Sequence, residues 1–408
     1  MAVSTDIRQA LFKLYARSMK LVFNYLPYKP PELVEGENSF GQLVAKLKSL
    51  GCSRTVLVTD SVLESLQLHS PLVEALKAAN NDVVIFSQVP PDPPFHIIES
   101  GVEVCLKHQF DSVIALGGGS VMDAAKVINV CATHGLQPRK VAGLFKIRKR
   151  GKPIACIPTT AGTGSEVTIA AVVSDPEKEA KYPVVDLAIV PDFAVLEGEL
   201  TRGLPAPITA ATGADALTHA LEAMCSRYAR EDTDAIAVDA IKMIFVALPR
   251  VATNGDDIEA RRMMLKASYL AGIAFTQANV GWVHAIAHQL GGIYHTPHGL
   301  ANGIVLPKVL AFYQADIPHV LANIARATAL VDKPGTDQHD AAQLVEKVGA
   351  LLKTCSIPDV LDDLLPEDIP RIAERAISET YKTPYGVPQY FESQGELEAF
   401  LKQFLKAS

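Results

Sequence analysis

The sequence predicts two domains, an α/β domain built on a parallel sheet and, after it, an all-helical domain. A chain of 408 residues exceeds the size of one typical hydrophobic core. Short apolar strands alternate with helical segments in the first half, whereas the helical period dominates from about residue 208 onward. Because the turn-prone stretch 203–207 separates these patterns, we expect an α/β domain over 1–204, with a helical extension at 1–32, and a helical domain over 205–408.

The elements of the first half follow from short apolar runs that alternate with segments of helical periodicity. In chain order they predict strands at 55–60, 82–89, 112–116 and 154–157 and helices at 70–79, 97–109 and 121–133. Uninterrupted apolar strands separated by helices are typical of a parallel sheet covered on both faces. Such sheets bind ligands beyond the carboxyl ends of their strands.

The second half contains few strand-like runs. Its periodic segments predict helices at 211–226, 232–248, 258–271, 320–330 and 341–352, with Pro- and Gly-containing breaks between them. A mostly helical domain is therefore expected.

Charge and composition exclude some classes of function. A formal net charge of −7 argues against a nucleic-acid binder, which needs a basic surface. No apolar stretch approaches the roughly 20 residues that span a bilayer, so we expect no membrane partner. The six cysteines are scattered, without a CxxC spacing and mostly within apolar runs, which predicts free thiols in a reducing, cytoplasmic compartment.

The segment 7–20 contains no acidic residue and mixes basic with apolar side chains at helical spacing. We interpret it as an amphipathic helix that docks on the protein. A mitochondrial transit peptide is the alternative.

A glycine-rich loop lies between the third predicted strand and its helix. It comprises Gly117, Gly118, Gly119 and Ser120. Consecutive glycines allow positive φ angles and a close approach to a phosphate, which the following helix N-terminus would attract. Ser120 and Asp123 have the spacing of a capping box. A purely structural turn is the alternative, and Met122 breaks the GxGxxG pattern of dinucleotide-binding loops.

A second polar loop, 158–166, follows the next strand. Its hydroxyl side chains include Thr159, Thr160, Thr163 and Ser165. They suit hydrogen bonding to a pyrophosphate, a ribose or a nicotinamide amide, although a polar loop could also simply cap a helix. Two such loops at neighbouring strand ends favour a nucleotide site more strongly than either alone.

Asp60 ends the first predicted strand. Its carboxylate could accept hydrogen bonds from an adenosine ribose and would repel a 2′-phosphate. An N-cap for the next helix is the alternative.

Possible metal ligands gather in the second half. Asp215 and His219 are four residues apart on an apolar predicted helix and share one face. This pair alone is explained as well by a simple Asp–His hydrogen bond. However, four of the eleven histidines, His284, His288, His295 and His298, fall within fifteen residues. One aspartate and three histidines form a plausible ligand set for Fe²⁺ or Zn²⁺ with one position open.

The motifs GGGS-x-x-D-x-x-K, PTTAGTGSE, GADALTHALEA and VHAIAHQLG…HTPHG, in this order and spacing, resemble the iron-containing, or group III, alcohol dehydrogenase family. The resemblance covers nearly the whole chain from about Thr55. It implies a dehydroquinate synthase-like fold, with a Rossmann-like N-terminal domain and an all-helical C-terminal domain. Two departures are a long segment before Leu33 and Glu197-Gly198 where the family commonly has Asp-Pro.

The resemblance also assigns roles to residues. It implies the metal ligands Asp215, His219, His284 and His298. His288 would line the catalytic pocket, and His295 would be peripheral or stand behind the ligands. The implied cofactor contacts are Gly118, Gly119, Ser120, Thr159, Thr160 and Lys181, and Asp60 would favour NAD over NADP.

The expected function is that of a metal-dependent, NAD-linked alcohol dehydrogenase or aldehyde reductase, with hydride transfer between a metal-bound alcohol and nicotinamide. Iron is the expected metal, with zinc as the alternative, and the fold class favours a homodimer. Alternatives on the same fold are a hydroxyacid–oxoacid transhydrogenase, a glycerol-type dehydrogenase and a maleylacetate reductase, the last disfavoured by the intact ligand set. A non-catalytic nucleotide-binding protein is a further alternative.

Overall fold

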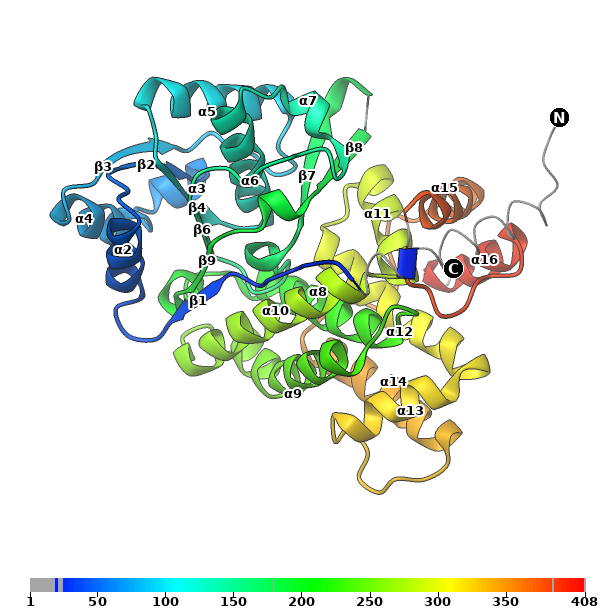
Figure 1. Ribbon diagram of the computed structural model, residues 1–408. Coiled ribbons are helices and arrows are strands. Elements are labelled where there is room, and N and C mark those ends of the chain that lie inside the picture. The colour runs from blue at the N-terminus through cyan, green and yellow to red at the C-terminus, as the bar shows by residue number, and fades with distance from the viewer. Residues whose placement is uncertain (1–18, 21–24, 179, 384, 407–408) are drawn as a thin grey trace. The chain divides into compact units, whose positions relative to one another are not determined.

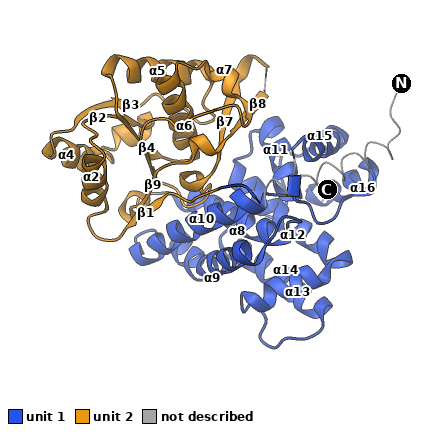
Figure 2. Cartoon of the chain, viewed as in Figure 1, with its two compact units in different colours: residues 1–27, 205–408 blue, residues 28–204 orange. Residues whose placement is uncertain are grey.

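The structure, a computed structural model, describes residues 19–20, 25–178, 180–383 and 385–406 (Figure 1). The chain divides into two compact units, one of residues 28–204 and one of residues 1–27 and 205–408 (Figure 2). The amphipathic helix expected at 7–20 lies almost wholly outside the described residues.

The unit 28–204 is built on a six-stranded parallel sheet. Its strands, in spatial order, are β1 (Glu32–Glu35), β9 (Phe193–Leu196), β6 (Ile154–Pro158), β4 (Ser112–Gly117), β2 (Arg54–Val58) and β3 (Asp82–Phe86). The helices between them are α2 (Ser39–Ser49), α3 (Ser61–Ser65), α4 (Ser70–Ala78), α5 (Phe95–His108), α6 (Gly119–His134) and α7 (Pro138–Val141). The predicted α/β class is confirmed, and β1 and β9 are strands that the sequence analysis missed.

Both faces of this sheet are buried, because successive strand residues point to opposite sides. On β2, Val56 and Val58 join the apolar cluster that contains the buried side chains of α5 and α6. Leu57, between them, joins the cluster of α2 and α4. The expectation of a sheet covered on both faces is therefore confirmed.

A second, three-stranded sheet was not predicted. It has the order β5 (Gly143–Leu144), β8 (Ala180–Val185), β7 (Ala170–Asp175), and β7 and β8 are antiparallel. Pro183 and Lys181, both exposed, interrupt the apolar pattern of β8, so it lacks the run of apolar residues that marks a buried strand.

The described residues from 205 onward form helices and no strand. They are α8 (Ala206–Cys225), α9 (Glu231–Thr253), α10 (Ile258–Ala278), α11 (Trp282–Tyr294), α12 (His298–Asp316), α13 (Pro318–Ala327), α14 (Asp337–Thr354), α15 (Ile369–Lys382) and α16 (Gln394–Leu401). Helix α8 packs against α9, α10 and α12, and α11 packs against α12 and α15. The all-helical class predicted for this part of the chain is confirmed.

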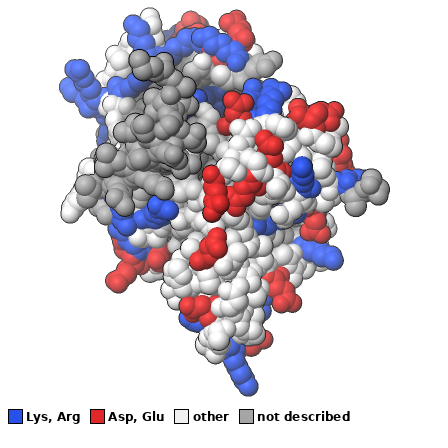
Figure 3. Space-filling model, turned by 90° about the vertical axis from the view of Figure 1, so that its right-hand side faces the viewer, with Lys and Arg blue, Asp and Glu red and all other residues white. Residues whose placement is uncertain are grey.

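The surface carries charges of both signs. Figure 3 shows Lys and Arg side chains interspersed with Asp and Glu side chains over the described part of one face. None of the helices in the described part of the chain is long and apolar enough to cross a bilayer.

Candidate metal and nucleotide sites

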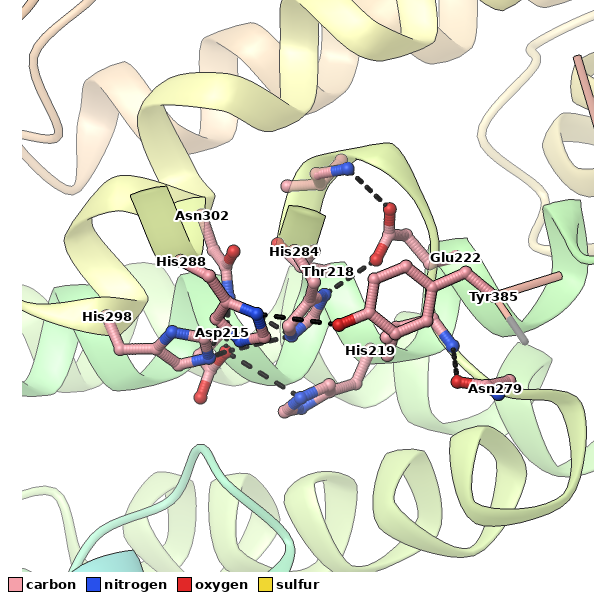
Figure 4. A network of polar contacts seen from close by, with 12 residues as sticks. Asp215, Thr218, His219, Glu222, Asn279, His284, His288, His298, Asn302 and Tyr385 are labelled. Atoms are coloured by element: carbon pink, nitrogen blue, oxygen red, sulfur yellow. Dashed lines mark hydrogen bonds and ion pairs between the residues drawn. The ribbon is translucent and has the colours of Figure 1, made fainter. Parts of the chain in front are cut away.

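Three helices bring the predicted metal ligands together. Asp215 and His219 lie on α8, His284 lies on α11, and His298 is the first residue of α12. Ligand atoms of Asp215, His284 and His298 lie within 4.8 Å of one another (Figure 4). The Nε2 atoms of His284 and His298 lie 3.8 and 3.5 Å from Asp215 Oδ1. Side chains from distant parts of the sequence therefore converge on one point.

His219 stands beside these three ligand atoms. Its Nε2 is 3.8 Å from Asp215 Oδ1, and its ring stacks on those of Phe275 and His284. The side chains of Asp215, His219 and His284 are buried, whereas that of His298 is 42% exposed. The cluster is thus mostly buried, and His298 is its exposed member.

Glycines allow α12 to approach α8 closely enough for this geometry. A Cβ atom on Gly299 would lie 2.2 Å from the carbonyl oxygen of Ala211, and one on Gly303 would lie 3.0 Å from the Cβ of Ala214. A side chain at Gly299 would therefore push His298 away from Asp215.

Asn302, one turn after His298, contacts three atoms of the cluster that can accept hydrogen bonds. Its Nδ2 donates to Asp215 Oδ1 at 2.7 Å and lies 3.2 Å from the Nε2 atoms of His284 and His298 (Figure 4). Its Oδ1 is buried and, among the described residues, has no hydrogen-bond partner. Three acceptor atoms that share one donor would fit a cation equally well.

A buried carboxylate stands behind His284. Glu222 Oε2 lies 2.6 Å from His284 Nδ1, and Oε1 accepts from the amide of Val283 at 2.7 Å (Figure 4). Burial raises the pKa of Glu222 to about 7. An acceptor at Nδ1 directs the Nε2 lone pair of His284 toward Asp215, which is the arrangement of a metal-binding histidine.

The charges in the cluster also favour a cation. Burial, together with His219 and His298, lowers the pKa of His284 well below its usual value, so its imidazole is neutral. Burial would raise the pKa of Asp215, but the three histidines outweigh it and lower this pKa. A carboxylate beside the neutral imidazole of His284 is a combination of donors that suits a metal ion.

His288 lies next to this cluster. Its ring stacks on that of His298 at 5.3 Å and meets that of His284 edge-on at 5.9 Å. Its Nδ1 is 2.6 Å from Glu379 Oε1, and its side chain is 39% exposed. His288 is therefore close to the ligand cluster, and its role in a catalytic pocket stays a prediction. His295 follows the last residue of α11 and is exposed.

The glycine loop follows β4 as expected, but its glycines are not explained by positive φ angles. None of Gly117, Gly118 and Gly119 has positive φ. A Cβ on Gly117 would lie 2.6 Å from that of Val121, and one on Gly119 would lie 2.9 Å from Thr163 Cγ2, so these glycines permit close packing. A Cβ on Gly118 would meet only Thr160, at 3.7 Å.

The predicted capping box of Ser120 and Asp123 is also wrong. Helix α6 begins at Gly119 with Gly118 as its N-cap, and no side chain caps it. Ser120 Oγ instead accepts from the amide of Asp92, and Asp123 Oδ1 accepts from Ser165 Oγ at 2.6 Å. The side chains of Ser120 and Asp123 therefore form hydrogen bonds with neighbouring loops. The first amides of α6 have no side-chain cap.

The two predicted loops are adjacent, because β4 pairs with β6 and Gly117 is opposite Pro158. The amide of Thr159 donates to the carbonyl of Gly117 at 3.1 Å. The ammonium group of Lys126 is fully buried and donates to Ser165 Oγ, to Thr168 Oγ1 and to the carbonyl of Ala170 at 2.8–3.0 Å. Lys126 therefore holds the second loop against α6.

The remaining predicted cofactor residues have partners within the protein. Lys181 Nζ forms an ion pair with Asp92 Oδ1 at 2.7 Å, and both side chains are exposed. Asp60 Oδ1 accepts from the amides of Val62 and Leu63 at 2.9 Å, so the alternative interpretation of Asp60 as the N-cap of α3 is confirmed. A single oxygen makes both of these bonds.

Known proteins match both units. The iron-containing alcohol dehydrogenase family matches residues 30–198, and the C-terminal part of the Fe-containing alcohol dehydrogenase family matches residues 209–403. The chain belongs to the iron-containing alcohol dehydrogenase family. The resemblance noted in the sequence is confirmed.

Individual iron-containing alcohol dehydrogenases cover almost the full chain. The NAD-dependent methanol dehydrogenase of Bacillus methanolicus is 35% identical over 379 residues, which are 92% of this chain and 91% of the relative. The 1,3-propanediol dehydrogenase of Citrobacter freundii is 38% identical over 349 residues, 84% of this chain and 90% of the relative. A crystal structure of 1,3-propanediol oxidoreductase has a TM-score of 0.88 at 34% identity and covers 93% of this chain and 99% of that structure.

Five residues that contact candidate site residues of this iron-containing alcohol dehydrogenase were missed by the sequence analysis: Asp92, Glu222, Asn302, Glu379 and Tyr385. Two of them carried a signal. Glu222 follows His219 by three residues and Asn302 follows His298 by four, so each shares a helical face with a predicted ligand. Glu379 lies 91 residues after His288, and no spacing rule could have paired them.

Replacing Glu222 by Gln should weaken metal binding about 10- to 100-fold, as is typical when the partner of a metal-binding histidine is lost. The amide of the new Gln side chain can present its NH₂ group to His284 Nδ1. The His284 ring would then no longer be held in one orientation. Competition with a chelator for Zn²⁺ measures the change. Glu231→Gln, at the exposed start of α9, serves as the control. Equal Zn²⁺ affinity in the two variants would contradict this role.

Proposed function

We propose that this protein is a metal-dependent, NAD-linked alcohol dehydrogenase that also catalyses the reverse reaction, aldehyde reduction. The observation that carries the proposal is the convergence of Asp215, His284 and His298, of which His298 is exposed, around one point. We assign Asp215, His219, His284 and His298 as metal ligands, with iron as the metal and zinc as the alternative. The nucleotide-binding domain that we propose is the unit of residues 28–204, not 1–204 as expected from the sequence, because residues 1–27 group with 205–408, the metal-binding domain.

When bound, the cation supplies a Lewis acid for the alcohol oxygen, and NAD supplies the hydride acceptor. The residues of the chain bind and orient these groups. Glu222 holds the His284 ring, and Asn302 lies against Asp215. The exposed His288, next to the cluster, accepts the hydroxyl proton in alcohol oxidation and returns it in aldehyde reduction.

We propose that the nucleotide binds at the two adjacent loops that follow β4 and β6. A Cβ on Gly118 would make only an ordinary contact with Thr160, and the amides at the start of α6 have no side-chain cap, which suits a pyrophosphate. The further contacts that we propose are Gly117, Gly119, Ser120, Asp123, Thr159, Thr163, Ser165 and Lys181. The ion pair with Asp92 means that Lys181 would have to exchange partners to reach a phosphate.

Replacing Asp60 by Asn should relax the preference for NAD over NADP. The amide oxygen can keep the N-cap of α3, while the negative charge that repels a 2′-phosphate is lost. We expect the ratio of kcat/KM for NADP to that for NAD to rise by about tenfold, or roughly 1.4 kcal/mol. An unchanged ratio, with helix content intact by circular dichroism, would leave Asp60 with its capping role alone.

The substrates that we propose are small alcohols and aldehydes. Relatives are named as methanol, 1,3-propanediol and 1-propanol dehydrogenases. A homodimer in the cytoplasm is proposed with this activity, on the basis of the fold class and the six buried free cysteines.

The test is NADH formation by the metal-free protein and by the protein reloaded with Fe²⁺ or Zn²⁺. The substrate panel contains C1–C4 alcohols, glycerol and 2-hydroxy acids. Turnover of alcohols that requires metal is the expected result. Turnover of 2-hydroxy acids with an oxoacid acceptor and no added NAD would instead indicate a transhydrogenase, and absence of turnover in every condition would overturn the proposal.

A further inference from the structure

Asp92 lies at the edge of the six-stranded sheet where its strands end, close to the glycine loop. It follows β3 and stands in the sequence Pro-Pro-Asp-Pro-Pro, residues 90–94. Its amide donates to Ser120 Oγ at 3.2 Å, and Ser120 is the second residue of α6. Parallel strands end at the same edge of a sheet, where such folds bind their ligands. A carboxylate therefore stands beside the proposed cofactor loops.

The backbone of Asp92 is held from two sides. Besides the bond to Ser120, its carbonyl accepts from Ser174 Oγ at 2.6 Å, and the amide of Ser174 donates to the carbonyl of Pro93 at 2.9 Å. Ser174 lies on β7. The prolines on either side of Asp92 have fixed φ angles, which restricts the loop further. Asp92 is thus tied to both α6 and β7.

The carboxylate of Asp92 is paired with Lys181 of β8. Its Oδ1 lies 2.7 Å from Lys181 Nζ, and the side chains of Asp92 and Lys181 are 58% and 53% exposed. Lys181 is opposite Ser174 in the antiparallel pairing of β8 with β7, so the strand that anchors Asp92 also places Lys181 beside it. Because both charges face solvent, the pair can separate without leaving a buried charge behind.

A nucleotide pyrophosphate would meet both of these charges. It is anionic, and the amides at the start of α6, to which we assign it, have no side-chain cap. Lys181 is one of its proposed contacts. In the free protein, the Asp92 carboxylate takes the place on Lys181 that a phosphate oxygen would take, and its own charge repels the incoming anion. Asp92 therefore opposes nucleotide binding.

We propose that Asp92 is an internal competitor of the cofactor, which pairs with Lys181 in the free protein and loses this partner to the pyrophosphate when NAD or NADH binds. This inference rests on the proposed alcohol dehydrogenase function and its assignment of Lys181 as a cofactor contact. The competition lowers the affinity for both forms of the cofactor and speeds their release. Faster release raises turnover wherever release is the slow step.

The test measures the Kd for NADH in the full-length, Zn²⁺-loaded protein by NADH fluorescence, for Asp92→Asn, Lys181→Met and the double variant. Asn keeps the shape of the side chain and tolerates the φ of 51° at this position, but carries no charge. We expect Asp92→Asn to lower the Kd about three- to tenfold and Lys181→Met to raise it by a similar factor. In the double variant no partner is left to compete for, so the change at Asp92 should lower the Kd by about twofold or less.

Two further readouts report on the competition itself. In wild type, binding replaces one ion pair of Lys181 by another, whereas in Asp92→Asn it forms a new one. The Kd of Asp92→Asn should therefore rise more steeply with salt than that of wild type. Stopped-flow dissociation of NADH should be slower in Asp92→Asn, by a factor close to the change in Kd. Asp82→Asn is the matched control, because Asp82 is exposed at the start of β3, the other end of the same strand, and should leave all three quantities unchanged.

The outcomes separate the two proposals. A higher Kd for NADH in Asp92→Asn would mean that Asp92 holds the nucleotide, and an equal decrease with and without Lys181 would exclude competition; either result overturns the inference. If the variants behave as expected but wild type oxidises no alcohol with any metal, the proposed function fails and the role of Asp92 stands. If wild type oxidises alcohol and Asp92→Asn leaves the Kd unchanged, the function stands and the role of Asp92 is overturned. Wild type that binds no NADH would overturn both.

Discussion

Replacing Asp215 by Asn is expected to abolish metal retention and to lower alcohol oxidation by more than about a thousandfold. Asp215 supplies the negative charge of the cluster, and its Oδ1 lies 3.5–3.8 Å from the Nε2 atoms of three histidines. The amide has the same shape but no charge, and its NH₂ group can point at the histidine lone pairs. Loss of a Lewis acid that contributes several kcal/mol to catalysis accounts for the size of the effect.

Metal content after dialysis and NADH formation measure this prediction together. Asp239→Asn, on the exposed face of α9, is the control for an Asp-to-Asn change in the same unit. The Asp215 variant should keep wild-type helix content by circular dichroism. A variant that retains one metal per chain, or that turns over alcohol at the wild-type rate after dialysis, would remove Asp215 from the site.

Replacing Lys126 by Met is expected to lower the free energy of unfolding of the nucleotide-binding unit by about 3 kcal/mol. The removed ammonium group would leave the hydroxyls and carbonyls around Ser165, Thr168 and Ala170 buried without their donor. Asp123, 4.0 Å from the ammonium group, and the buried Glu166 would also lose a nearby positive charge. Burial already raises the pKa of Glu166 to about 7.

Urea unfolding and amide hydrogen exchange over residues 165–172 measure this loss. The loop should exchange faster than in wild type, and the Kd for NAD should rise, because Ser165 belongs to the proposed cofactor loop. Lys140→Met, on the exposed surface of α7, controls for the loss of one lysine charge. Equal unfolding free energies in the two variants would mean that the hydrogen bonds of Lys126 contribute nothing net.

The fold was largely predictable because its strongest signals are local. The strands at 54–58 and 112–117 are runs of apolar residues, and the long helices of the second half keep an apolar period over several turns. The hairpin of β7 and β8 was missed because its side chains are partly exposed and Pro183 interrupts it. The edge strand β1 is only four residues long and contains two glutamates, which local propensity does not favour as strand.

The candidate site was predictable as far as its members share a helix or a motif. Asp215 with His219, and His284 with His288, are pairs at a spacing of four, and the family motifs supplied the remaining ligand, His298. The partners of these residues were not predictable in the same way. The contact between His288 and Glu379 depends on the packing of α11 against α15, which is a tertiary event without a local sequence pattern.

The carboxamide of Asn302 has a consequence for how the enzyme matures. One neutral amide already bridges side chains from α8, α11 and α12. Contacts within the protein therefore hold Asp215, His284 and His298 together, so the proposed ligands are positioned by the polypeptide as well as by any ion that they bind. Small zinc domains, by contrast, collapse when their metal is withdrawn. In this protein the metal-free form should stay folded and bind its ion again without refolding.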